Sequence, residues 1–200
     1  MTTRSLWVHE DEEGMRRLWP ASALPYLAAD VQDSIDAAER NAAPNGMGFS
    51  DMRRIEAPDA SFAPEGLTRD VVMTGLGALL PRFQRLQVGD GKYYGFVDDD
   101  ALCFGFDNMC FIYGDVHDGL VCTFFFNAWT DDPAQSALLR QAIETIDALC
   151  PAAVVDYWVH MAGAVSDRTF MDRYFAALAG RIANPEGFDS IRNASRRDDA

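Results

Sequence analysis

The stretch 93–129, YYGFVDDDALCFGFDNMCFIYGDVHDGLVCTFFFNAW, decides the fold because it is a dense block of apolar and aromatic side chains. Short turns of aspartate, asparagine and glycine divide this block into segments whose composition is typical of strands. Turns this short favour antiparallel hairpins, because a parallel crossover needs about a dozen residues or more. The block therefore predicts successive antiparallel strands at Tyr93–Val97, Ala101–Phe106, Met109–Tyr113 and Leu120–Asn127.

The predicted strands are apolar on both sides. Over 120–127, Phe124 and Phe126 point to one face of the sheet, while Val121 and Phe125 point to the other. An antiparallel sheet with one wet face would instead alternate between apolar and polar residues. We therefore expect both faces to be covered, by helices on one side and by another layer or a partner on the other.

The remaining sequence adds helices and shorter strands around this block. Three- and four-residue spacing of apolar residues, together with start signals such as Asp132-Pro133, indicates helices. The predicted helices are 22–43, 68–80 (capped by Thr68), 132–149 and 166–178 (capped by Ser166), and the further predicted strands are 5–9 and 15–19 (as a hairpin), 52–56 and 154–161.

Together these elements predict an α+β fold. Its centre is an antiparallel meander sheet of about five or more strands with helices packed on it. With 200 residues, the chain fits a single domain, which we place at residues 1–180 and which a polar C-terminal tail follows at 181–200.

The charge of the chain bears on its partners. Thirty-one acidic residues oppose seventeen basic ones, for a formal net charge of −14. Such a charge repels nucleic acid and anionic membranes, which need clusters of Lys and Arg, and the arginines here occur only as isolated pairs. It would attract a protein partner with a basic surface and accelerate its approach. Solubility alone is the simpler explanation of the same charge.

The cysteines and the N-terminal segment favour a reducing compartment. Cys103, Cys110, Cys122 and Cys150 form no CxxC pair, and we expect them to be structural, buried thiols. The first residues lack the apolar core of a signal peptide, and no apolar stretch is long enough for a spanning helix. We therefore expect a cytoplasmic protein. The sequence predicts no metal site and no cofactor.

The carboxylates of the predicted turns are candidate partner-binding residues. A docking rim would consist of Asp98, Asp99, Asp100, Asp115 and Asp118. Their spacing matches no calcium-binding loop, and turns also favour aspartate for its own backbone hydrogen bonds. Tryptophans near strand ends are candidate anchors of an interface: Trp7, Trp19 and, chosen for the binding site, Trp129.

A catalytic interpretation would assemble a site from distant residues. His117 lies between two aspartates in a predicted loop and could act as a general base. Asp156, Trp158 and His160 alternate along a predicted strand, so that they would share one face and could line a polar pocket. More often such a pattern is only a hydrogen-bonded strand face.

These observations leave three hypotheses. The first is a binding protein that occludes a basic partner, in the manner of the bacterial immunity proteins that inhibit a cognate toxin; the likeness is one of properties, without a shared motif. The second is a small enzyme whose site includes His117, Asp156 and His160. The third is a structural domain that forms a homodimer through an apolar sheet face. The missing catalytic motif favours a binding protein over an enzyme.

Overall fold

A seven-stranded antiparallel sheet forms the centre of the computed structural model, which describes residues 3–42, 51, 53, 55–89 and 94–183. Its strand order is β10-β9-β2-β8-β7-β6-β3. The strands are β2 (Arg16–Pro20), β3 (Arg82–Phe83), β6 (Leu102–Asp107), β7 (Cys110–His117), β8 (Leu120–Ala128), β9 (Ala152–Asp156) and β10 (Met161–Ala164). The α+β fold with a large antiparallel sheet is therefore confirmed.

Three of the four predicted meander strands form the middle of this sheet, since β6, β7 and β8 pair in chain order. The first predicted strand, at 93–97, is wrong in its pairing: its described residues belong to a second, smaller sheet and do not pair with β6. Gly105 of β6 has a φ of 151°, which L residues rarely adopt, beside a register shift between Gly105 and Asp107. A Cβ atom on Gly105 would lie only 2.4 Å from the carbonyl oxygen of Cys110. Glycine is thus required where these two strands come closest.

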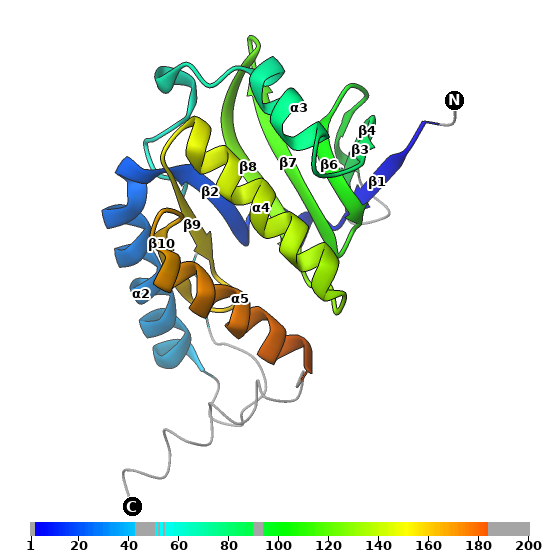
Figure 1. Cartoon of the computed structure of the whole chain (residues 1–200). Coiled ribbons are helices and arrows are strands. Elements are labelled where there is room, and N and C mark those ends of the chain that lie inside the picture. Colours follow the sequence, from blue (N-terminus) through cyan, green and yellow to red (C-terminus); the bar gives the residue numbers. More distant parts are fainter. Residues whose placement is uncertain (1–2, 43–50, 52, 54, 90–93, 184–200) are drawn as a thin grey trace, which may run out of the picture.

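One face of the sheet is covered by helices α3 (Arg69–Gly77), α4 (Pro133–Leu149) and α5 (Arg168–Ala183), and Figure 1 shows α4 crossing β7 and β8. Leu76 of α3, Ile143 of α4 and Tyr174 of α5 belong to the same buried cluster as Phe124 and Phe126. The predicted start of α4 is confirmed, because the Asp132 carboxylate accepts the backbone N–H groups of Ala134 and Gln135 at 2.8 and 3.3 Å.

The opposite face is covered in two parts. Near β9, helix α2 (Leu24–Asn41), which a 3-10 turn (Ala21–Ala23) precedes, packs through Leu27 and Val31 onto Val155. Over β6, β7 and β8 lies a three-stranded sheet of order β1-β4-β5. Its strands are β1 (Ser5–Val8), β4 (Arg85–Gly89) and β5 (Tyr94–Asp98). Both faces of the large sheet are covered, as the apolar strand pattern predicts.

Several local predictions are wrong. The segments 5–9 and 15–19 form no hairpin: a short helix α1 (Glu10–Glu13) separates them, β1 pairs in parallel with β4, and β2 enters the large sheet. The described residues of 52–56 form no strand, while β3 and β4 were not predicted.

The ends of two predicted helices also differ. The Thr68 side chain makes no capping hydrogen bond, and α3 ends at Gly77 rather than at residue 80. Asp167, rather than Ser166, accepts the backbone N–H of Phe170 at 3.1 Å at the start of α5. Helix α5 runs to Ala183, so that the expected boundary at residue 181 lies within its last turn. The rest of the expected tail, 184–200, lies outside the described residues.

Candidate partner-binding site

The five candidate aspartates gather at one end of the large sheet. Asp98, Asp99 and Asp100 belong to the end of β5 and the turn into β6, which begins opposite Gly114 of β7. Asp115 follows in β7, and Asp118 lies in the tight turn into β8. The hairpin connections of the meander thus bring together carboxylates that are up to twenty positions apart in the sequence.

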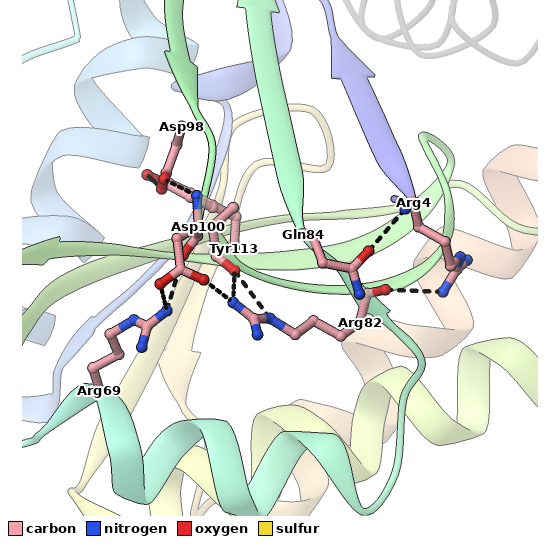
Figure 2. Close-up of polar contacts among 8 residues, drawn as sticks. Arg4, Arg69, Arg82, Gln84, Asp98, Asp100 and Tyr113 are labelled. Carbon is pink, nitrogen blue, oxygen red and sulfur yellow. Dashed lines mark hydrogen bonds and ion pairs between the residues drawn. The ribbon is translucent and has the colours of Figure 1, made fainter. Parts of the chain in front are cut away.

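Asp100 is held between two arginines. Its carboxylate accepts hydrogen bonds from Arg69 at 2.7 Å and from Arg82 at 2.6 Å, so that one side chain links α3, β3 and the β5–β6 turn (Figure 2). The hydrogen bond from Arg82, together with the positive charge of both arginines, lowers the pKa of Asp100. The cluster is nevertheless open to water, since 76% of the Asp100 side chain is exposed.

The two preceding aspartates are engaged as well. Asp99 pairs with Arg85 of β4 at 3.0 Å. Asp98 accepts the backbone N–H of Asp100 at 3.1 Å and lies 3.4 Å from the hydroxyl of Tyr113 (Figure 2). Burial, followed by the negative charge of Asp98 and then that of Asp115, raises the pKa of Tyr113. These turn carboxylates therefore organise the fold locally, in addition to any contact with a partner.

Asp115 and Asp118 differ from Asp99 and Asp100, which pair with arginines. Within the described part of the chain, no arginine pairs with either of them. Asp118 lies 3.6 Å from the ring of His117, and both of these side chains are more than 80% exposed. The described residues thus leave three of the five carboxylates at this end without an arginine: those of Asp98, Asp115 and Asp118.

Trp129 lies at the opposite end of the sheet. Its backbone N–H donates to Met109 at 2.8 Å, and its ring lies 4.4 Å from the guanidinium of Arg16. Trp129 lies six positions after Thr123, the residue of β8 that pairs with Asp115, and six positions correspond to about 20 Å along a strand. The structure therefore does not place Trp129 beside the aspartates.

The residues around Trp129 form a buried polar network that the sequence analysis missed. The fully buried carboxylate of Asp156 accepts hydrogen bonds from Arg16 at 2.6 Å and from the Tyr174 hydroxyl at 2.9 Å. Arg16 also donates to the side chain of Asn127 at 2.6 Å. A signal was available in the sequence, because Asp156 ends an otherwise apolar strand and thus needs a buried partner.

The proposed alternation of Asp156, Trp158 and His160 is wrong. β9 ends at Asp156, and the chain turns at 157–160 before β10 returns antiparallel to β9. The Asp156 carboxylate accepts the backbone N–H of Trp158 at 2.8 Å, and His160 has a φ of 55° in this turn. Burial, followed by the charge of Arg181, lowers the pKa of His160.

The three residues of the catalytic hypothesis are not brought together. His117 lies at the β7–β8 turn, whereas Asp156 lies at the other end of the sheet, level with Phe126 through its pairing with Arg16. The stretch of β8 from Leu120 to Phe126 corresponds to about 20 Å. Burial raises the pKa of Cys110 to about 12, and that of Cys103 still further, so these thiols are poor nucleophiles.

An exposed apolar surface lies beside the aspartates, on the outer face of the small sheet. Trp7 of β1 and Val97 of β5 flank Gln87 of β4 in one cross-strand row, and Trp7 and Val97 are about 40% exposed. The neighbouring row contains Arg85 with its partner Asp99. Of the three tryptophans considered as anchors, Trp7 is the one near the acidic end, whereas Trp19 is buried.

A hollow of the surface lies elsewhere. It is a groove of about 560 Å³ between the start of α4 and the end of α5, and its lining includes Pro133, Arg140, Phe175 and Ile182. None of the predicted site residues lines this groove. Within the described residues, no group of three or more His, Cys, Asp or Glu side chains is placed to hold a metal ion, and no helix has the length and apolar character needed to cross a membrane.

Comparison of the chain with protein-family models, with curated proteins and with solved structures finds no match. The site must therefore be interpreted from its own geometry and charge.

Proposed function

We propose that this chain is a binding protein that occludes a basic surface of a partner protein, as an immunity protein occludes its toxin. The observation that carries the proposal is the position of Trp7 and Val97, which lie exposed on the small sheet beside the carboxylate end. Aromatic anchors next to charged residues are typical of protein interfaces.

The charges assign different roles to the five aspartates. Asp99 and Asp100 are paired with arginines and serve mainly to hold the β5–β6 turn. Asp115 and Asp118 have no arginine partner among the described residues. They would attract a cationic surface, and no ion pair with an arginine would have to break when that surface binds. Trp129, which lies under Arg16 at the other end, has no place in this interface.

The test uses the polypeptide encoded by the gene adjacent to that of this chain as the candidate partner. Binding is measured by calorimetry at low and at high salt, together with protection of cells that express the candidate partner. We expect Trp7→Ala to weaken binding by about 2 kcal/mol, the usual effect at an aromatic hot spot. Raising the salt should weaken binding further, because screening reduces charge attraction.

The matched control is Tyr26→Ala. Tyr26 is an aromatic residue of α2 that is 42% exposed, close to the 40% of Trp7, but it lies on another part of the surface. Equal losses from both variants would contradict a site on the small sheet. Binding that is insensitive to salt would exclude attraction by charge.

A further inference from the structure

Strand β5 is an open edge of the small sheet. Among the described strands it pairs only with β4, so that the backbone groups on its other side have no strand partner there. Gly95, Phe96 and Val97 are all exposed. The register shift of the β4–β5 pair falls at Val88/Gly89, so that pairing is regular from Phe96 to Asp98.

Edge strands normally carry features that prevent another strand from pairing with them, such as charged residues in the strand, proline or a bulge. Strand β5 ends in a charged residue, Asp98, and its pairing with β4 shifts at Val88/Gly89. Between these two features, the stretch from Gly95 to Val97 has no charged residue and no proline. The opposite edge, β1, is less suited to a new strand, since Leu6 and Val8 are buried. In β5, by contrast, successive side chains are exposed on both faces of the sheet.

The surroundings of β5 indicate what kind of strand would fit. On the inner side, Phe96 packs against Tyr113 with 6.3 Å between the ring centroids. The carboxylates of Asp98 and Asp115 are close enough to Tyr113 to interact with it electrostatically. On the outer side, Val97 ends the cross-strand row that begins at Trp7 and passes through Gln87. A complementary strand would thus carry a basic residue toward the carboxylates and an aliphatic residue beside Val97.

Charge decides between a foreign segment and a second copy of the chain. A second copy would bring another net charge of −14 to an end of the molecule that already carries exposed carboxylates. Like charges brought together in this way oppose association, whereas a basic segment is attracted.

We propose that β5 accepts an extended segment of the partner, with alternating basic and aliphatic residues, as an additional strand of the small sheet. This inference rests on the proposed function and specifies its mode of binding. Backbone hydrogen bonds along 95–98 would supply affinity, and the side chains on either face of the added strand would supply selectivity.

The first experiment uses a synthetic peptide of about seven residues in which lysine and valine alternate, with both ends capped, titrated into the full-length protein and followed by amide NMR. Two further peptides carry N-methyl groups on the amides of either the lysines or the valines. Only alternate amides of an added strand face the edge that it joins. One methylated peptide should therefore lose about tenfold or more in affinity while the other keeps its affinity to within about threefold.

Equal affinities of the two methylated peptides would overturn strand addition, because attraction by charge alone does not distinguish the two sets of amides. Absence of binding by the unmethylated peptide up to about 1 mM would also overturn it. A monomer–dimer equilibrium that Val97→Lys abolishes would overturn the choice of a foreign segment and assign the edge to a second copy.

Two variants test the role of the carboxylates. Asp115→Asn should weaken binding of the unmethylated peptide by about threefold or more, since it removes a charge near Tyr113. Asp131→Asn is the matched control: it removes another exposed aspartate charge, just after Trp129 at the opposite end of the sheet, and should change the affinity by less than about twofold. Equal effects would contradict a location along β5.

Hydrogen exchange in the complex with the neighbouring gene product separates this inference from the proposed function. Protection of the amides of 95–98 on binding supports strand addition. Binding that Trp7→Ala weakens but that leaves these amides unprotected would retain the proposed function and overturn strand addition. Absence of any binding by that polypeptide would contradict the proposed function alone, since the peptide titration is independent of it.

Discussion

The two ends of the large sheet carry ionic clusters built from the same residue types in opposite environments. At one end Asp156 and Arg16 are both at least 98% buried, and Tyr174 and Asn127 add hydrogen bonds to the pair, while Nη2 of Arg16 is buried without a hydrogen-bond partner among the described residues. At the other end Asp100 lies between Arg69 and Arg82 but is 76% exposed. The buried pair therefore fixes which strands adjoin, whereas the exposed cluster leaves its residues accessible to a partner.

Removal of the buried carboxylate of Asp156 should lower the free energy of unfolding more than any other variant considered below. Asp156→Ala would leave the charge of Arg16 buried without its counter-charge and would deprive Tyr174 of its acceptor. Loss of one partner of a buried ion pair costs about 3–5 kcal/mol in the free energy of unfolding. Urea unfolding followed by circular dichroism measures this change.

The control for this variant is Asp115→Ala, an exposed aspartate at the other end of the same sheet. It should change the free energy of unfolding by less than about 0.5 kcal/mol. A loss below about 1 kcal/mol for Asp156→Ala would indicate that the pair behaves like a surface salt bridge.

Tyr174→Phe separates the hydrogen bond from the charge at the same end. The variant keeps the ring that stacks on Phe170 at 6.0 Å but removes the hydroxyl that donates to Asp156 at 2.9 Å. Hydrogen bonds to charged groups contribute about 1.5–3 kcal/mol to stability. Tyr174→Phe should therefore lower the free energy of unfolding by less than Asp156→Ala does. In the Asp156→Ala background the same change should have little effect, and equal losses in both backgrounds would show that Tyr174 acts independently of Asp156.

The contrast between the two ends also explains what the sequence could predict. The meander of β6, β7 and β8 and the start of α4 were predictable, because hairpins and helix caps depend on residues close together in the chain. The pairing of β1 with β4 was not, since Ser5 lies opposite Arg85, eighty positions away, and local periodicity does not encode such a contact.

The candidate site was likewise predictable only where it depends on residues close together in the chain. The gathering of Asp98–Asp100 with Asp115 follows from the predicted hairpins, but their arginine partners come from α3, β3 and β4, outside the block. The turn at 157–160 was missed because it contains no glycine or proline and requires His160 to adopt a left-handed φ.

At the exposed end, Asp100→Asn should lower the free energy of unfolding only modestly. Exposed ion pairs contribute about 0.2–1 kcal/mol, and salt screens them. Because the pKa of Asp100 is lowered in the folded protein, its contribution is present above the unfolded pKa of about 3.9 and is lost as the pH falls through the lower folded value. The difference in unfolding free energy between wild type and variant should thus be larger at neutral pH than at about pH 3. An equal difference at both pH values would exclude the ionised carboxylate as its source.

Asp115→Asn and Asp118→Asn should have the smallest effect on stability, and its sign is informative. Neither carboxylate has an arginine partner among the described residues, and each adds to a net charge of −14. Removal of one charge should therefore leave the free energy of unfolding unchanged or raise it by up to about 0.5 kcal/mol at low salt. A loss of more than about 1 kcal/mol would show that these carboxylates support the fold. Unchanged stability combined with weaker partner binding by Asp115→Asn would instead assign that carboxylate to the interface, since the lost charge would then act on the partner and not on the fold.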